Sequence, residues 1–384
     1  MIPYGKQSIS DEDVRAVTEV LRSDFLTQGP CVPAFERAVA EYCGAPHAVA
    51  VNSATSALHI ACLALGVGAG DVVWTSPNTF VASANCARYC GADVDFVDID
   101  PVTYNLSVDA LARKLEEANA RGRLPKVVIP VHFAGLPCDM AEIGALAQRY
   151  GFKVVEDASH AIGARYRDTV VGDCRYSDIT VFSFHPVKIV TTAEGGLATT
   201  RSGDLARRMG LFRSHGVTRD PTLLQRDEGS WYYEQHCLGY NYRLTDLQAA
   251  LGISQLKRLD AWVARRHELA DVYDRELRDL PLVLPQRTSS SHSALHLYVV
   301  QIDGTKTGLG RRAVFEQLRA KGIGVNVHYI PVHTQPDFHS LGFCGGQFPQ
   351  SELYYSRCFS LPMYAGLTDR DQGKVIAAIR EVFA

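Results

Sequence analysis

The sequence has no long apolar run and no excess of charge of either sign. Its 384 residues include 39 Lys and Arg against 42 Asp and Glu, which gives a formal net charge of −3. Such a balance produces no long-range field to attract nucleic acid or an anionic bilayer. No stretch approaches the length of a membrane span, and the first ten residues lack the apolar core of a secretory signal. We therefore expect a cytoplasmic protein that binds neither nucleic acid nor membranes.

The ten cysteines form no CxxC pair. Several lie in apolar stretches, Cys62, Cys86 and Cys90 among them, where cysteine behaves as a small hydrophobe. We expect no metal site and no disulfide framework, in keeping with a reducing compartment. A hydrophobic content of 46% supplies a core large enough for two joined domains.

Between residues 48 and 200, short apolar runs alternate with helical patterns, which predicts an α/β fold with a parallel sheet and crossover helices. A buried helix face is indicated by the spacing of Ala54, Ala57, Leu58, Ala61, Cys62 and Leu65, and a second helix is predicted over 139–150. The candidate strands are 72–75, 94–99, 127–131, 153–157, 180–184 and 196–200.

After residue 200 the pattern changes to a helix over 204–213, an irregular aromatic-rich loop over 218–242 and a long helical region from 246 to about 277. The remainder predicts a smaller α/β unit that the N-terminal residues complete. We predict a large domain over residues 14–260 and a small domain formed by residues 1–13 and 261–384. The elements expected in the small domain are strands at 296–302 and 325–330 and helices at 310–321 and 369–382.

Two segments could bind phosphate. Residues 66–70 are glycine-rich, but a helical pattern precedes them and a strand follows, the reverse of a dinucleotide-binding loop, so we interpret them as a helix end. Residues 52–56 follow a strand-like run and begin a predicted helix, where free N–H groups and the helix dipole favour an anion. An ordinary Ser/Thr N-cap explains the same residues equally well.

Asp157 is at the carboxyl end of one predicted buried strand, and Lys188 lies just beyond the end of another. Open α/β sheets place ligands at the carboxyl ends of strands, and a buried carboxylate is costly unless paired. Asp157 could pair with a pyridinium nitrogen or cap a helix. Lys188 could be a solvated surface side chain, or a desolvated amine whose lowered pKa suits imine formation. The order of phosphate-binding segment, aspartate and lysine favours the catalytic interpretation.

The whole chain resembles the DegT/DnrJ/EryC1/StrS family of sugar aminotransferases. Ala54 and Ala193 replace glycines that are common elsewhere in the family. The resemblance implies an aspartate aminotransferase-like (type I) fold, with a mostly parallel central sheet in the large domain and a smaller C-terminal α/β domain, and pyridoxal 5'-phosphate (PLP) as cofactor. The stretches that carry it are 23–30, 52–59, 182–188, 214–216, 239–243 and 327–329.

Carried over residue by residue, the resemblance makes Lys188 the Schiff-base lysine and Asp157 the partner of the pyridinium nitrogen. Phe80 is expected to stack on the cofactor ring and His160 to lie beside it. The remaining cofactor-binding residues are a phosphate cup of Ala54, Thr55 and Ser183, and Asn241 delivered from the neighbouring subunit of a homodimer. Substrate contacts are implied for Tyr4, Asp24, Phe25, Leu26, Thr27, His328, Tyr329 and Ile330.

Within the family, the resemblance is to the branch of pseudaminic acid biosynthesis. It implies transfer of the amino group of L-glutamate to the C4 ketone of UDP-4-keto-6-deoxy-N-acetyl-β-L-altrosamine. Another nucleotide-linked keto sugar, or amination at carbon 3, stays open as an alternative. A PLP-dependent sugar dehydratase is disfavoured because such enzymes have histidine where this chain has Lys188. A non-catalytic sensor is disfavoured by the intact lysine, aspartate and phosphate cup. Arg213, Arg243 or a backbone site could hold the carboxylates of glutamate.

Overall fold

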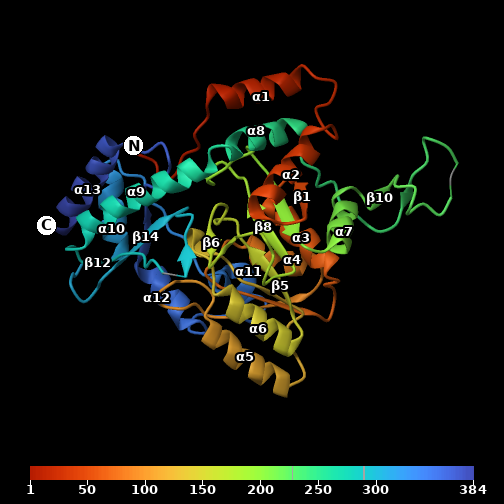
Figure 1. Cartoon of the computed structure of the whole chain (residues 1–384). Coiled ribbons are helices and arrows are strands. Elements are labelled where there is room, and N and C mark those ends of the chain that lie inside the picture. The colour runs from red at the N-terminus through yellow and green to blue at the C-terminus, as the bar shows by residue number, and fades with distance from the viewer. Residues whose placement is uncertain (227, 289) are drawn as a thin grey trace.

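The computed structural model describes residues 1–226, 228–288 and 290–384. At its centre lies a seven-stranded sheet of order β1-β9-β8-β5-β4-β2-β3 (Figure 1). Neighbours from β8 to β3 pair in parallel, whereas β9 runs antiparallel to both β1 and β8. The mostly parallel sheet predicted from the sequence is confirmed. Its strands are β1 (His47–Val51), β2 (Val72–Thr75), β3 (Asp93–Phe96), β4 (Val127–Ile129), β5 (Lys153–Asp157), β8 (Ile179–Ser183) and β9 (Gly196–Thr200).

Alternate residues of the central strands pack on opposite faces of the sheet, as the pleat requires. Val127 and Ile129 belong to the apolar cluster that contains residues of α3 and α4, whereas Val128 belongs to the cluster that contains residues of α5 and α6. Both faces are therefore covered, which explains why these strands are continuous apolar runs in the sequence. The covering helices are α2 (Cys31–Cys43), α3 (Ala54–Ala64), α4 (Ala82–Tyr89), α5 (Val108–Ala120), α6 (Met140–Tyr150), α7 (Gly203–Arg213) and α8 (Asp246–Leu256).

The predicted strand at 94–99 is shorter in the structure, because the chain leaves the sheet after Val97 donates its last ladder bond to Thr75. Ile99 then pairs with Leu106 and fills a separate apolar cluster. The glycine-rich segment at 66–70 follows the end of α3, with Gly66 in the left-handed region at φ 75°, so its interpretation as a helix end is confirmed.

A second, three-stranded antiparallel sheet contains β12 (Leu282–Val283), β14 (Tyr298–Ile302) and β15 (Cys358–Leu361). It packs with α9 (Leu259–Leu277), α10 (Arg311–Ala320) and α13 (Asp369–Phe383) around one apolar cluster. The N-terminus joins this unit, since the Ile2 N–H donates to the Gly322 carbonyl at 2.8 Å. The domain boundary at 260/261 stays a prediction; it falls in the first turn of α9.

The strand predicted at 325–330 is wrong. Only one isolated bridge, between Asn326 and Ser360, links this segment to β15. Side chains take most of its remaining backbone bonds: the Tyr329 N–H donates to Asn78 Oδ1, and the Tyr354 hydroxyl donates to the His328 carbonyl. The β-branched and aromatic residues of 325–330 are typical of a strand. Side chains of this segment line a cavity instead, and no described strand pairs with it along its length.

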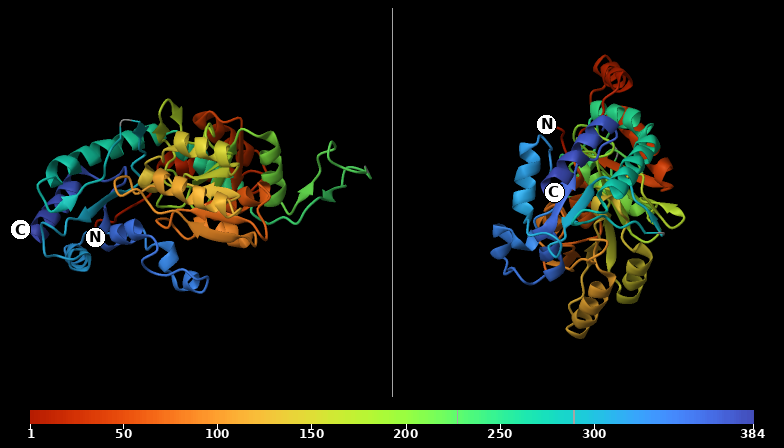
Figure 2. Two further views of the ribbon diagram at one scale, coloured as in Figure 1. Left: turned by 90° about the horizontal axis from the view of Figure 1, so that it is seen from below. Right: turned by 90° about the vertical axis from the view of Figure 1, so that its left-hand side faces the viewer.

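Two segments project from this body. Helix α1 (Asp11–Leu21) lies on α8, and an arm containing β10 (Val217–Thr218) and β11 (Glu234–Gln235) extends away from the molecule (Figure 2). The smaller elements are β6 (Arg165–Tyr166), β7 (Thr169–Val170), β13 (Ser291–His292), η1 (Phe133–Gly135), η2 (Val332–Thr334), α11 (Pro336–His339) and α12 (Pro349–Arg357).

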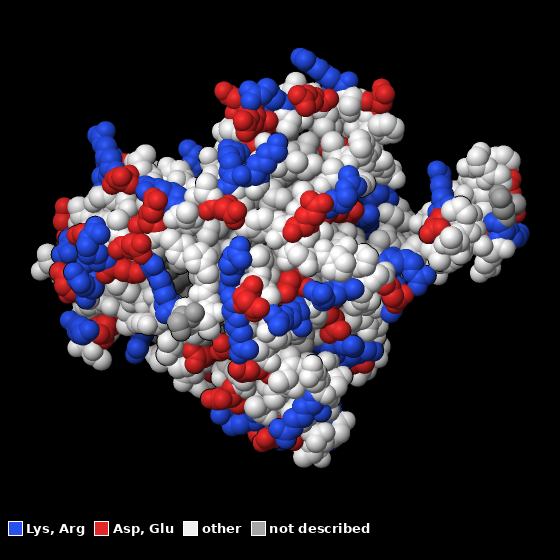
Figure 3. Space-filling model, in the orientation of Figure 1, with Lys and Arg blue, Asp and Glu red and all other residues white. Residues whose placement is uncertain are grey.

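Charges of both signs are interspersed over the face seen in Figure 3, in keeping with the balanced composition. Among the residues that the structure describes, no helix combines the length and the apolar character that crossing a membrane requires.

Candidate active site

A cavity of about 890 Å³ opens at the carboxyl ends of the parallel strands. This is where open α/β sheets bind ligands, because polar loop residues follow each buried strand there. The structure brings most of the predicted site residues onto this one cavity. They are Tyr4, Ala54, Thr55, Phe80, Asp157, His160, Ser183, Lys188, His328 and Tyr329.

The start of α3 presents unpaired donors to the cavity. Ser53 is the N-cap, and its side chain accepts the Ser56 N–H at 3.1 Å. The N–H groups of Ala54 and Thr55 donate to no other described residue. The two open interpretations of this segment are therefore compatible, since one hydroxyl caps the helix while two N–H groups remain available for an anion.

Gly196 allows the first residue of β9 to touch this helix start. A Cβ at Gly196 would lie 2.4 Å from the carbonyl carbon and oxygen of Ser53 and 2.5 Å from the nitrogen of Ala54. Only glycine permits that approach. The N-terminus of α3 is thereby held against the first residue of β9, which pairs with Ser183 of β8.

Asp157, the last residue of β5, is 5% exposed and faces the cavity. The Ser83 hydroxyl donates to its Oδ2 at 2.6 Å, and the Ser159 N–H donates to its Oδ1 at 3.1 Å. The next described element after Asp157 is the strand β6, which begins at Arg165, and no helix starts directly behind Asp157, so the helix-cap alternative is wrong. Two donors stabilise the charged carboxylate, and its open side is available to a cationic group.

Lys188 lies in the loop after β8 and makes no side-chain hydrogen bond or ion pair with any described residue. Burial lowers its pKa to about 8, against the opposing effect of Asp157. The amine therefore lies in the cavity rather than on the open surface, and at neutral pH about one tenth of it is unprotonated. Phe80 is 59% exposed because its ring faces the cavity rather than the core.

His160, His328 and Tyr329 form a connected group on the same cavity. The His160 and Tyr329 rings stack at 21°, and His160 Nε2 lies 3.0 Å from the Tyr329 hydroxyl. Burial lowers the pKa of His328 to about 3, with a further contribution from Lys188. Burial, then Lys188, lowers the pKa of His160 as well. These imidazoles are neutral at physiological pH and act as hydrogen-bonding groups rather than cations.

Several predicted residues lie outside the cavity of a single chain and are exposed: Asp24, Phe25, Leu26, Thr27, Ile330 and Asn241. The Asn241 carbonyl accepts a hydrogen bond from Asn52 at 3.4 Å, which leaves the Asn241 side chain on the surface beside α3. Arg213 is paired with Glu36 and donates to the Ala50 carbonyl, so it is not available to a substrate. The roles of these residues stay predictions.

Sequence reasoning missed Ser83 and His296. Ser83 is 74 residues from Asp157 in the sequence, and no local pattern links the two. His296 lies at the start of a predicted strand, where its burial at 4% exposure resembles that of any core residue. A sequence pattern cannot report a contact that only the fold creates.

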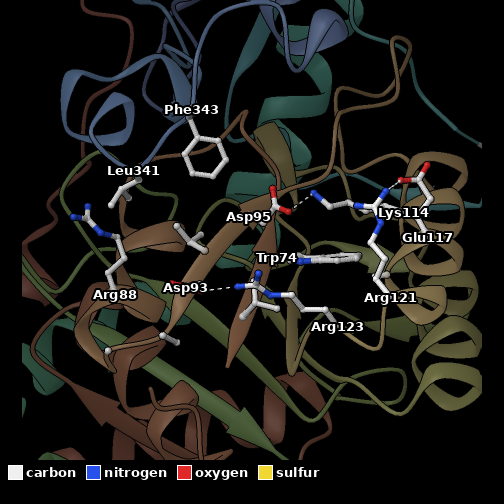
Figure 4. Close-up of a pocket in the computed structure, with 15 residues that line it drawn as sticks. Trp74, Arg88, Asp93, Asp95, Lys114, Glu117, Arg121, Arg123, Leu341 and Phe343 are labelled. Atoms are coloured by element: carbon white, nitrogen blue, oxygen red, sulfur yellow. Dashed lines mark hydrogen bonds and ion pairs between the residues drawn. The ribbon is translucent and has the colours of Figure 1, made fainter. Parts of the chain in front are cut away.

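A second cavity of about 650 Å³ lies at the edge strand β3 (Figure 4). Its cations are all paired with carboxylates, and the Lys114 amine also donates to the Phe96 carbonyl of the edge strand. Because no charge is left unpaired, this cavity lacks the open chemistry of the first one and instead protects the sheet edge. The pairs are Arg88–Asp337, Lys114–Asp95, Arg121–Glu117 and Arg123–Asp93.

The model of the DegT/DnrJ/EryC1/StrS aminotransferase family matches residues 7–380. The chain belongs to this family. The family and the type I fold predicted from the sequence are thus confirmed, and the protein is a PLP-dependent aminotransferase. The donors at α3, the carboxylate of Asp157 and the amine of Lys188 are chemically suited to the phosphate, ring nitrogen and aldehyde of PLP.

Among its relatives, the chain is 41% identical to the spore coat polysaccharide biosynthesis protein SpsC of Bacillus subtilis, over 99% of this chain and 97% of that protein. The structure of Helicobacter pylori PseC, an aminotransferase of pseudaminic acid biosynthesis, is similar with a TM-score of 0.90 and 31% identity, over 100% and 99% of the two chains. The PLP form of Spr1654 from Streptococcus pneumoniae, a candidate sugar aminotransferase, has a TM-score of 0.89 and 29% identity, over 99% and 98%.

Proposed function

We propose that the protein transfers the amino group of L-glutamate to the ketone of a nucleotide-linked sugar. The observation that carries this proposal is the convergence of Lys188, Asp157 and the open N-terminus of α3 on one cavity. The likeness to SpsC and PseC supports a sugar as the acceptor, because both names refer to the biosynthesis of saccharides.

In this proposal, Lys188 would hold the aldehyde carbon of PLP, and the N–H groups of Ala54 and Thr55 and the Ser183 hydroxyl would hold its phosphate. Bound PLP supplies an electron sink for the carbanion that forms at the substrate carbon. Asp157, whose carboxylate accepts hydrogen bonds from Ser83 and Ser159, would be the partner of the ring nitrogen. Phe80 lines the same cavity and would cover the ring and help to exclude water.

With PLP bound, the Lys188 amine would take the proton from the α-carbon of the donor and pass it to the cofactor in the first half-reaction. In the second half-reaction it would run the reverse transfer, from the cofactor to the former keto carbon of the sugar. A pKa of about 8 suits both steps, because near neutral pH neither accepting nor donating a proton costs the amine much free energy.

The acceptor that we propose is UDP-4-keto-6-deoxy-N-acetyl-β-L-altrosamine, aminated at C4. The similarity to PseC over the full length of both chains supports this sugar. The higher identity to SpsC favours a second candidate, a keto sugar that enters a surface polysaccharide. The two candidates share the chemistry described above and differ in the sugar ring and its substituents.

We further propose a homodimer with shared active sites. Asn241 does not line the cavity of its own chain, and the projecting arm carries exposed apolar side chains, Trp231 at 71% and Leu238 at 78%. Phe25 and Leu26 are also half exposed. Apolar surface of this kind is expected to be covered by a second copy of the chain, whose Asn241 would then complete the phosphate site.

The test is amination of a panel of UDP- and dTDP-linked keto sugars by purified, PLP-loaded protein with L-glutamate, with products identified by mass and NMR. Preference for the altrosamine derivative supports the first candidate, and preference for another keto sugar supports the second. A protein that takes up no PLP, or that aminates no sugar in the panel, refutes the proposal.

A further inference from the structure

His296 lines the cavity, yet it has no part in the chemistry described so far. Its ring is buried, its Nδ1 is enclosed without a hydrogen-bond partner, and no described residue bonds its Nε2. An unpaired buried polar group costs about 1–3 kcal/mol. The His296 ring remains buried despite this loss of free energy, and its Nε2 is less enclosed than its Nδ1. It is therefore suited to bind a partner that enters the cavity.

The two other buried histidines on the cavity already have partners. His160 Nδ1 accepts the Ala134 N–H at 3.3 Å, and its Nε2 bonds the Tyr329 hydroxyl. His328 Nδ1 bonds the Ser360 hydroxyl at 2.7 Å. Of the three, His296 is the one with a ring nitrogen free to bind a substrate.

The position of His296 is held from both sides. The buried Arg266 donates to the carbonyls of Leu295 and His296, each at 3.1 Å. On the other side, a Cβ at Gly135 would lie 3.0 Å from the backbone nitrogen of His296, so only glycine allows this close packing. The His296 ring also packs on His160, with 4.5 Å between ring centroids. The imidazole is therefore preorganised.

His296 and the reacting amine of Lys188 line the same cavity. Burial lowers the pKa of His296, and His160 and Lys188 lower it further, so the ring is neutral and carries one N–H. The amino donor must bring its α-carbon to the Lys188 amine, and its α-carboxylate is bonded to that carbon. The carboxylate therefore arrives among the groups that surround Lys188.

Within the described part of the chain, no arginine lines this cavity, and Arg213 is occupied by Glu36. We infer that His296 donates a hydrogen bond from Nε2 to the α-carboxylate of the amino donor and so determines binding of the donor rather than of the sugar. This inference rests on the proposed function and names the donor site within it.

The experiment measures the two half-reactions separately by the absorbance of the cofactor, with L-glutamate for the first and the keto sugar for the second. His296→Phe keeps a ring but removes both nitrogens. Loss of one hydrogen bond to a charged group should raise the apparent Kd for glutamate at least about tenfold. The apparent Kd for the sugar should stay within about threefold, which is under 0.7 kcal/mol. His267→Phe is the matched control, because His267 bonds the Ser293 carbonyl outside the cavity.

His296→Gln places an amide near the position of Nε2 and should restore glutamate binding, whereas His296→Asn, whose amide lies near Nδ1, should not. This pair decides the matter even where His296→Phe fails to fold. In ¹⁵N NMR of the histidine-labelled holoenzyme, glutarate should move the Nε2 resonance of His296, identified by its loss in His296→Gln.

Unchanged glutamate affinity in His296→Phe, equal affinity in the Gln and Asn variants, or an unmoved resonance overturns the inference. If the enzyme still aminates its sugar from glutamate in those cases, only the role of His296 fails. A protein that takes up no PLP, or uses no amino acid as donor, overturns this inference together with the proposed function.

Discussion

The hydroxyl of Ser83 is predicted to control the charge on Asp157, and Ser83→Ala tests this. The hydroxyl donates to Asp157 Oδ2 at 2.6 Å, and Thr79 Oγ1 lies 2.8 Å from the same hydroxyl. Removing a hydrogen bond to a buried charged group costs about 1.5–3 kcal/mol. Asp157 then keeps only the Ser159 donor, so its carboxylate is a weaker partner for the ring nitrogen of the cofactor.

If the whole cost appears in the transition state, kcat falls by a factor of about 10 to 150, because each 1.4 kcal/mol is tenfold. The KM for glutamate should change little, since Ser83 does not line the cavity. The assays are steady-state kinetics and the ¹⁵N chemical shift of labelled PLP, which should move toward the value of an unprotonated ring nitrogen.

Ser177→Ala is a matched control. Ser177 donates to Glu156, a buried carboxylate that precedes Asp157 in β5 and therefore points to the other face of the sheet. Both variants should lose stability to chemical denaturation, but only Ser83→Ala should lose kcat. A Ser83→Ala enzyme with wild-type kcat and an unchanged ¹⁵N shift would show that this hydroxyl has a structural role alone.

Further predictions follow from the same geometry. Lys188→Ala should fold but remain colourless and yield no borohydride-trapped adduct; a trapped adduct would assign the imine to another lysine. The rate of PLP uptake by the apoprotein should rise with pH and level off above about pH 8, since burial lowers the pKa of Lys188 to about 8 and only the neutral amine reacts; a flat profile contradicts this. Gly196→Ala should weaken PLP binding and lower the Tm, because the new Cβ would lie 2.4 Å from the Ser53 carbonyl, whereas Gly210→Ala, with nothing within 4 Å, should not. Refolding an equal mixture of Lys188→Ala and Asn241→Ala chains should recover about one quarter of wild-type activity, because half of the dimers then hold one intact site. No recovery, or a monomer by sedimentation, contradicts the shared site.

Elements with strong local patterns could be predicted from the sequence. The strands β2, β5 and β9 have the predicted bounds. A strand that is covered on both faces is a short apolar run in the sequence, and this pattern does not depend on which strands lie beside it in the sheet. The helix that follows β1 was also predictable, since its serine N-cap and its apolar residues are local. The long helical region from 246 is interrupted at Lys257 and Arg258, a break that no glycine or proline announces.

Pairings between distant segments could not be predicted. The sequence does not reveal that β9 runs antiparallel to β8, because direction depends on how the connecting chain crosses the sheet. The segment at 325–330 has the composition of a strand but bonds to side chains instead. Asp24 through Thr27 resemble a substrate-binding stretch, yet they lie outside the cavity of one chain.

The sequence by itself determined the family, the cofactor and the two residues expected to carry the chemistry, since each depends on residue types in a fixed order along the chain. Only the tertiary structure decided which groups surround them. The Ser83 donor to Asp157, the lowered pKa of Lys188 and the unpaired nitrogens of His296 all arise from burial and from contacts between residues far apart in the chain. These are properties of a packed interior, and no linear pattern encodes them.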